Sequence, residues 1–354
     1  MATSSTTGNY PDVVQANDAN DAAVIDTGHT VTLTGNVTGN NYFKINSGGT
    51  LVGAGYSITV DNDSSDWSFL NEGTISGVLD VIITNPNGVA KLNFNGQAGN
   101  VRNLTINHAS CVATLEDENQ TLDGNLIIEE GTLTTLDSDG TSSRDLTCGD
   151  ITVENGGTLT GNASAITCES LTVESGGTYN ATSGITKLTA GSSSHSPQPL
   201  HTTAGTMYHN NGTVFYNGRG GNSLRWSAGH IYNLDMLPSG STGSGITLQG
   251  DASSKVTIDG DFTIENGSGN GILLVLGGAS YDLEVGGNMY MRTNYPTASE
   301  NVRFYNGADP TGNWRIHGTL KLSGNEHVYF RAPTSAGSLK VGGFINEGAY
   351  FQST

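Results

Sequence analysis

Short runs in which apolar and polar residues alternate recur along almost the whole chain, and glycine ends most of them. The clearest case is the segment 146–159, which matches the segment 166–179 position by position at an offset of twenty residues. In each copy, aliphatic residues alternate with threonine before a Gly-Gly pair. Alternation with a period of two is typical of a strand with one buried face, and glycine permits the turn that follows. The pattern predicts that each repeat is one coil of a parallel β-solenoid.

A second motif recurs in the later part of the chain and consists of two short alternating strands joined by a glycine. Its four copies are 256–264, 283–291, 314–322 and 339–345. Glycine lets the backbone turn sharply without a Cβ clash, so each copy predicts a bent pair of strands at one edge of a coil. At about 20 to 30 residues per coil, the chain would form about 12 to 15 coils. We therefore expect an all-β fold, a parallel β-helix with the right-handed crossovers usual for parallel strands and no long helices.

Composition and charge divide the chain into three parts. Residues 1–21 are polar and are predicted to form an N-terminal arm or attachment segment. Residues 22–190 are predicted to form acidic coils of the β-helix, and residues 191–354 to form coils that are richer in aromatic residues and have longer loops. The net charge is −19, and residues 1–190 account for −17 of it. Such an acidic chain repels nucleic acid and anionic membranes, so we expect neither as a partner. No apolar stretch is long enough to predict membrane insertion.

Cysteine content and the first residues bear on the compartment. Cys111, Cys148 and Cys168 are too few for a disulfide framework, and we expect free thiols that fill the interior. Coils stacked about 4.8 Å apart would still bring Cys148 and Cys168 within reach of a disulfide, so that alternative stays open. The first residues carry neither a basic region nor an apolar run, and we expect no signal peptide.

Acidic turns are the candidates for catalysis or cation binding. Two carboxylates facing one groove could hydrolyse a glycosidic bond, and the available groups are Asp259 with Asp261 and those of the turn 116–118. The turns 61–66 and 137–140 carry alternating aspartates but lack the order of ligands that ends in glutamate in a calcium loop. All these residues also suit solvated turns and outward strand positions. We therefore expect no catalytic residue, no bound metal and no cofactor.

Aromatic residues, histidine and arginine concentrate where the repeats are interrupted, between residues 207 and 232. Among glycines and asparagines, these side chains form the mixture that stacks on sugar rings and bonds to their hydroxyl groups. The candidate glycan-binding residues are Tyr208, His209, Tyr216, Arg219, Arg225, Trp226, His230 and Tyr232. The alternative is that Phe215 and Trp226 pack inside wider coils or against a neighbouring subunit.

Two segments carry a resemblance to known proteins. Residues 151–162 and 171–178 resemble the β-helix repeats of autotransporter passenger domains and of bacteriophage tail fibres and tailspikes. The resemblance implies the fold, because such repeats are general to the architecture. Autotransporters are expected to carry an N-terminal signal and a C-terminal membrane barrel, and this sequence shows neither. The comparison therefore favours a phage virion protein.

The residues leave three functional hypotheses open. The first is a noncatalytic structural protein of a bacteriophage virion, a fibre, spike or capsid-surface protein, with adhesion to host cell-surface polysaccharide. Because exposed strand edges invite pairing, it would assemble with copies of itself or with other virion proteins through the C-terminal coil or the N-terminal arm. The alternatives are a polysaccharide depolymerase on the same scaffold and a prokaryotic cell-surface adhesin or filament subunit.

Overall fold

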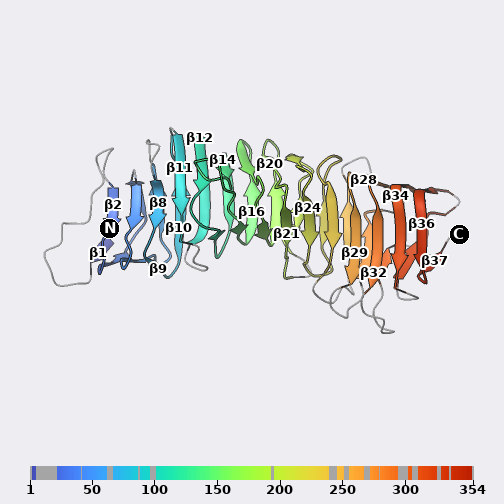
Figure 1. The fold of residues 1–354 in the computed structure, drawn as a ribbon. Helices are drawn as coiled ribbons and strands as arrows, with labels where there is room; N and C mark the ends of the chain where they lie inside the picture. The colour runs from blue at the N-terminus through green and yellow to red at the C-terminus, as the bar shows by residue number, and fades with distance from the viewer. Residues whose placement is uncertain are drawn as a thin grey trace. The chain divides into compact units, whose positions relative to one another are not determined.

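The computed structural model (Figure 1) consists of β-strands joined by turns, and the residues that it describes form no helix. The described residues are 2–4, 22–40, 42–61, 67–86, 88–95, 101–192, 195–238, 245–250, 255–266, 272–278, 280–293, 302–304, 310–324, 328–334 and 336–352. Contacts divide the chain into two compact units, unit 1 with Met1–Ile166 and Ser175–Asn180 and unit 2 with Thr167–Glu174 and Ala181–Thr354. Most of the predicted N-terminal arm and of the acidic turn 61–66 lies outside the described residues.

Most of the strands are short, as the alternating runs predict. The strands of unit 1 are β1 (Ala2–Ser4), β2 (Ala22–Ile25), β3 (Thr30–Leu33), β4 (Val37–Asn40), β5 (Tyr42–Ile45), β6 (Thr50–Val52), β7 (Ser57–Val60), β8 (Trp67–Asn71), β9 (Thr74–Ser76), β10 (Leu79–Ile83), β11 (Gly88–Asn93), β12 (Val101–Leu115), β13 (Gln120–Thr121), β14 (Leu126–Thr134), β15 (Leu146–Thr147), β16 (Asp150–Val153), β17 (Gly157–Thr160) and β20 (Thr178–Asn180). The division between the units falls within β18 (Ile166–Cys168). The strands of unit 2 are β19 (Ser170–Val173), β21 (Ile185–Leu188), β22 (Leu200–His201), β23 (Thr206–Tyr208), β24 (Thr213–Tyr216), β25 (Ser223–Arg225), β26 (Asn233–Met236), β27 (Ile246–Gln249), β28 (Lys255–Ile258), β29 (Phe262–Asn266), β30 (Ile272–Leu276), β31 (Asp282–Val285), β32 (Met289–Thr293), β33 (Val302–Phe304), β34 (Asn313–Ser323), β35 (Val328–Arg331), β36 (Ser338–Glu347) and β37 (Tyr350–Gln352).

Strands of unit 1 pair in parallel with the equivalent strands of the next coil. One ladder runs β2–β5–β8–β11–β12–β14–β17–β20. A second ladder runs β4–β7–β10–β12–β14–β16, and a third runs β3–β6–β9. Only β1, among the strand pairs described in this unit, is antiparallel to its neighbour, β3. The long strands β12 and β14 belong to two ladders because they turn a corner of the coil.

Unit 2 repeats this arrangement. Its ladders are β19–β22–β25–β27–β30–β33–β35–β37, β21–β24–β26–β29–β32–β34–β36 and β28–β31–β34. Strand β34 pairs with β31 through its first half and with β32 through its second, and its pairing with β36 shifts register between Ile316 and Thr319. This is the bent strand pair predicted from the central glycine. Parallel strands stacked as a β-solenoid of about 12 turns confirm the predicted fold class.

Inward-pointing aliphatic side chains form continuous columns along each ladder. In unit 1, Ile58, Val81, Leu104, Leu126 and Ile151 are paired in successive strands, and each is fully buried. Burying such a side chain contributes about 1.5 to 3 kcal/mol. Because a coil cannot cover its own apolar edge, the contact with the next coil supplies this stabilisation.

The Gly-Gly pair that ends each repeat has two separate causes. Gly156 has a φ of +91° and Gly176 a φ of +85°, a left-handed conformation that other residues rarely adopt. At the next position, a Cβ on Gly157 would lie 2.3 Å from the carbonyl oxygen of Ile128. The first glycine therefore provides the turn, and the second allows two coils to approach closely.

Candidate functional site

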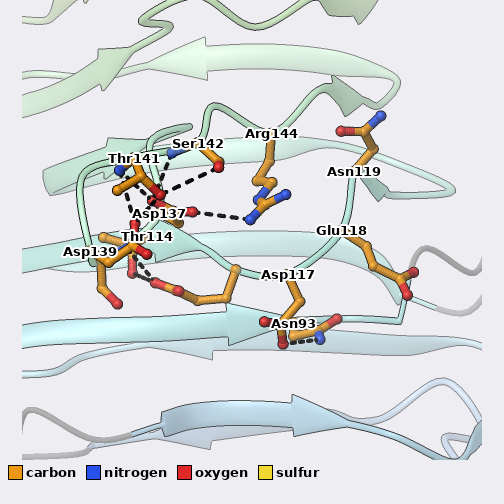
Figure 2. A network of polar contacts seen from close by, with 12 residues as sticks. Asn93, Thr114, Asp117, Glu118, Asn119, Asp137, Asp139, Thr141, Ser142 and Arg144 are labelled. Carbon is orange, nitrogen blue, oxygen red and sulfur yellow. Dashed lines mark hydrogen bonds and ion pairs between the residues drawn. The ribbon is translucent and has the colours of Figure 1, made fainter.

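A polar network in unit 1 contains both the acidic turn 116–118 and the calcium-like turn 137–140 (Figure 2). These turns follow β12 and β14, which are paired in parallel, so the carboxyl ends of the two strands bring the turns together. After β14 the chain forms a small hairpin, closed by an antiparallel bridge between Leu136 and Ser143. Two turns that are separate in the sequence therefore form one cluster.

Asp137 is the centre of the hairpin (Figure 2). One carboxylate oxygen, Oδ1, accepts hydrogen bonds from the backbone N–H groups of Thr141 and Ser142 at 3.0 and 3.1 Å. The other, Oδ2, accepts a bond from the guanidinium of Arg144 at 3.0 Å. Asp137 is only 7% exposed. Its buried charge is therefore paired and hydrogen-bonded by its own loop, the condition under which a buried charge is tolerated.

Asp139 also bonds to its own turn. Its Oδ1 accepts bonds from the backbone N–H and the hydroxyl of Thr141, at 2.8 and 2.7 Å. Gly140, with a φ of +75°, provides the left-handed residue at the tip. A calcium site would need several carboxylate oxygens directed at one point. In this turn the carboxylate oxygens of Asp137 and Asp139 accept hydrogen bonds from N–H and O–H donors instead. These bonds hold the hairpin closed.

Glu116 connects the hairpin to the neighbouring turn. Its side chain is buried, and Oε1 accepts bonds from the hydroxyl of Thr114 at 2.6 Å and from the backbone N–H of Ser138 at 2.8 Å. Gln120 supports the same turn, since its amide nitrogen donates to the carbonyl oxygens of Glu116 and Glu118 at 3.1 and 2.7 Å. The turn is therefore held by side chains on both sides.

Amide–carboxylate pairs extend the network to neighbouring coils (Figure 2). Asn93 donates to Asp117 at 2.9 Å, and Asn119 both donates to Asp145 at 3.1 Å and accepts its backbone N–H at 2.8 Å. Asp117 adopts a φ of +60°, which aspartate tolerates better than most residues. Each of these carboxylates bonds to a donor from a coil 24 to 26 residues away. The network therefore joins coils together.

The environment of Asp137 lowers its pKa to about 2. The largest cause is the neighbouring carboxyl group of Asp139, which can donate to Asp137 only when Asp139 itself carries the proton, and the N–H groups of Ser142 and Thr141 and the charge of Arg144 act in the same direction. Asp137 is therefore ionised at neutral pH. A general acid in glycoside hydrolysis needs the opposite, a carboxyl group with a raised pKa.

The lowered pKa predicts a pH-dependent stability. A carboxylate whose pKa is lower in the folded than in the unfolded chain stabilises the fold at a pH above its ordinary pKa, near 3.8, and this contribution is lost as the pH falls towards 2. We expect Asp137→Asn to lower the thermal unfolding midpoint at pH 7, and the difference from wild type to shrink towards pH 2. Glu130→Gln, at an exposed position, is the control and should change little. A difference that persists undiminished at pH 2 would contradict the assignment.

Asp259 and Asp261, the other predicted carboxylate pair, have different surroundings. Asp261 accepts bonds from the backbone and side-chain nitrogens of Asn288 at 2.7 and 3.2 Å, and its own N–H donates to Asn233 at 2.8 Å. Asn288 in turn accepts the N–H of Thr319 at 2.9 Å. Asp261 thus belongs to a polar ladder that joins successive coils, whereas Asp259 lies 3.7 Å from the ring nitrogen of His209. The sequence patterns did not predict this ladder, although Asp261, Asn288 and Thr319 directly follow glycines of the repeated motif.

Two of the candidate glycan-binding residues are in the interior of unit 2. Tyr216 and Trp226 are both fully buried. The indole N–H of Trp226 donates to the carbonyl oxygen of Thr257 at 2.8 Å, and the hydroxyl of Tyr216 donates to that of Arg219. Burial also raises the pKa of Tyr216 to about 12. Side chains without accessible surface cannot contact a sugar. Trp226 instead packs inside the coil, which is the alternative considered from the sequence.

Three other candidates meet at one corner of unit 2. His209, His230 and Tyr232 line a pocket of about 10 Å³, together with residues such as Thr182 and Met207. The rings of His209 and Tyr232 lie 5.2 Å apart. A volume of this size accommodates about one water molecule. The depression at this corner therefore cannot enclose a sugar ring.

The remaining candidates are exposed. Tyr208 precedes His209 and is 61% exposed. Arg225 is paired in register with His201 and Gln249, and neither Arg225 nor Arg219 lines the corner pocket. Glycan binding by the six accessible candidates stays a prediction.

All three cysteines are buried free thiols, as predicted. Burial raises the pKa of Cys111 to about 12 and also raises the pKa of Cys148. Both are therefore protonated and unreactive at neutral pH. The part of the chain that the structure describes contains no helix with the length and apolar character to cross a membrane.

Comparisons of the chain with protein-family models, with curated proteins and with solved structures find no match.

Proposed function

We propose that this chain is a noncatalytic structural component of a bacteriophage particle, a fibre, spike or capsid-surface protein, and that its second half contacts host glycans. Assembly with copies of itself or with other virion proteins, through the C-terminal coil or the N-terminal arm, belongs to the same proposal. The solenoid supports this proposal. Its stability comes from apolar columns shared by neighbouring coils, so the outward residues can vary without unfolding the protein.

One observation carries the noncatalytic part of the proposal. In the network of Figure 2, Asp137, Asp139 and Glu116 accept hydrogen bonds from Thr114 at the end of β12 and from donors of the hairpin that follows β14. Hydrolysis of a glycoside needs one carboxyl group that gives up a proton and a second that faces the sugar or a water molecule. Carboxylates that close turns and join coils are unsuited to either role.

Incubation with polysaccharide tests the noncatalytic part. We expect capsular and lipopolysaccharide extracts to keep their length distribution, measured by size-exclusion chromatography, after incubation with the purified protein. A tailspike depolymerase of known specificity, with its own substrate, is the positive control. Shortening of any extract would contradict the proposal and favour the depolymerase alternative.

Location is tested separately. Antibodies raised against the chain, detected with gold particles in the electron microscope, should label the surface of the phage particles that package its gene. Labelling of the bacterial envelope in the absence of particles would favour the cell-surface alternative instead.

A further inference from the structure

One outward row of side chains in unit 2 combines aromatic and polar groups on a regular surface. The row crosses β21, β24, β26, β29, β32 and β34, strands that follow one another along the solenoid (Figure 1). Its members, each paired in register with the next, are Lys187, Phe215, Asp235, Thr263, Tyr290 and Lys321. We call these six residues the outer row. Since paired strands lie about 4.8 Å apart, the row presents one side chain per coil at that spacing.

Aromatic rings stand at two positions of the outer row. Phe215 and Tyr290 are partly exposed and point away from the core, because their neighbours in the strands, Val214 and Met289, are buried. Three strand spacings separate them, about 14 Å. The ammonium of Lys187 lies 5.9 Å from the centroid of the Phe215 ring. Aromatic rings on a polar face offer the apolar surface that the C–H face of a sugar covers.

Polar groups fill the space between the two rings. Asp235 and Thr263 occupy the two intervening positions of the row. Burial raises the pKa of Asp235, and a hydrogen bond to Thr263 and the charge of Arg292 oppose that rise. A carboxyl group and a hydroxyl group both exchange hydrogen bonds with sugar hydroxyls. The order ring, carboxyl, hydroxyl, ring is suited to an extended carbohydrate.

The charged groups at and near the outer row indicate which class of carbohydrate it can bind. Beside the row, the guanidinium of Arg292 donates to Glu265 at 2.7 Å, and Lys321 is paired with Glu347 at 3.0 Å. Glu265 and Glu347 neutralise these two cations, of which Lys321 belongs to the row, while the ammonium of Lys187 lies against the Phe215 ring. Most of the net charge of −19 belongs to residues 1–190, so the local groups decide at the outer row: the carboxyl groups of Asp235 in the row and Glu265 beside it disfavour polyanions.

We propose that the outer row binds an uncharged polysaccharide laid across the coils, with sugar rings stacked on Phe215 and Tyr290 and hydroxyl groups bonded to Asp235 and Thr263. This inference rests on the proposed glycan contact and specifies its place and its ligand class. A ligand that spans both rings is an oligosaccharide, because a single sugar ring cannot cover about 14 Å. Binding should therefore strengthen with chain length.

Affinity electrophoresis tests the inference. The full chain is run in native gels that contain dextran, yeast mannan, mixed-linkage β-glucan or galactan, with hyaluronan as the anionic polymer. We expect at least one uncharged polymer to retard the wild-type protein. Phe215→Ala and Tyr290→Ala should each weaken the apparent affinity about tenfold, the size of one lost stacking contact. Tyr290→Phe keeps the ring and should retain most of the binding.

Tyr350→Ala is the matched control, since Tyr350 is a 50% exposed tyrosine of the same unit, in a strand outside the outer row, and is not a candidate glycan-binding residue. It should leave retardation unchanged. The three alanine variants should also keep the wild-type circular dichroism spectrum, because all three side chains point outward. Retardation by hyaluronan alone, no retardation by any uncharged polymer, or full retardation of both row variants would each overturn the inference.

The results of affinity electrophoresis can be told apart from those of the immunogold labelling that tests the proposed function. Protein that labels phage particles but is not retarded overturns the outer-row site and leaves the structural role intact. Protein that is retarded through Phe215 and Tyr290, but labels no particle, overturns the virion assignment and retains the site.

Discussion

Replacing Gly286 by alanine is expected to unfold the coils around it. A Cβ on Gly286 would lie 2.1 Å from the carbonyl oxygen of Asp259 and 2.9 Å from its carbonyl carbon. Both are backbone atoms of the neighbouring coil, so relief requires that the coils move apart. The same glycine donates its N–H to the carbonyl oxygen of Ile258 at 2.8 Å, and that bond would be lost as well. We expect a loss of more than about 4 kcal/mol of unfolding free energy, the range of the most disruptive single substitutions.

Urea unfolding followed by circular dichroism measures this effect. Gly191→Ala is the matched control, because a Cβ at Gly191 meets no atom within 4 Å and its backbone is outside the left-handed region. It should leave stability unchanged or raise it by up to about 1 kcal/mol, through a more restricted unfolded chain. Equal unfolding curves for Gly286→Ala and Gly191→Ala would show that the coils at this corner are not in contact.

Phe330→Ala should produce the second large effect. Phe330 is fully buried in an aromatic column of unit 2, with ring centroids 5.9 Å from Phe304, 5.8 Å from Phe351 and 5.7 Å from Trp314. Truncation removes contacts with all three rings and leaves a cavity that a solenoid cannot close without shifting a coil. The expected cost is about 3 to 5 kcal/mol.

The control for Phe330 is Phe344→Ala. Phe344 has the same chemistry but is 46% exposed, so its truncation should cost less than about 1 kcal/mol. Both variants are compared with wild type by urea unfolding at one protein concentration. Similar costs for the two phenylalanines would contradict the assignment of Phe330 to the core.

The architecture was predictable because it depends on patterns within short segments. Alternation identified the strands, and the Gly-Gly pairs and the central glycines of the later motif identified the corners. Gly157 illustrates the physical basis, since a Cβ there would lie 2.3 Å from a carbonyl oxygen of the preceding coil. Because only glycine avoids such a clash, glycine recurs in the sequence where this corner recurs.

Contacts between outward residues were far less predictable. Hydrogen-bonded partners in neighbouring coils lie 20 residues apart for Asp26 and Asn46, but 28 for Asn233 and Asp261. Loops of variable length are tolerated at little cost, so the spacing of partners does not follow one period. Aromatic residues show the same limit, because the composition around Tyr216 and Trp226 suits a sugar surface equally well whether the rings point inward or outward.

The parallel β-solenoid could be predicted from the sequence alone, because strand alternation and corner glycines are local requirements that every coil must meet. Which polar side chains contact one another became known only from the three-dimensional fold. It paired Asp137 with Arg144, placed Asp261 in a ladder between coils, and aligned Phe215 with Tyr290 on one outer face. The physical reason is that stacking register depends on the length of every loop between two coils, and a loop's length carries no information about which side chains it brings together.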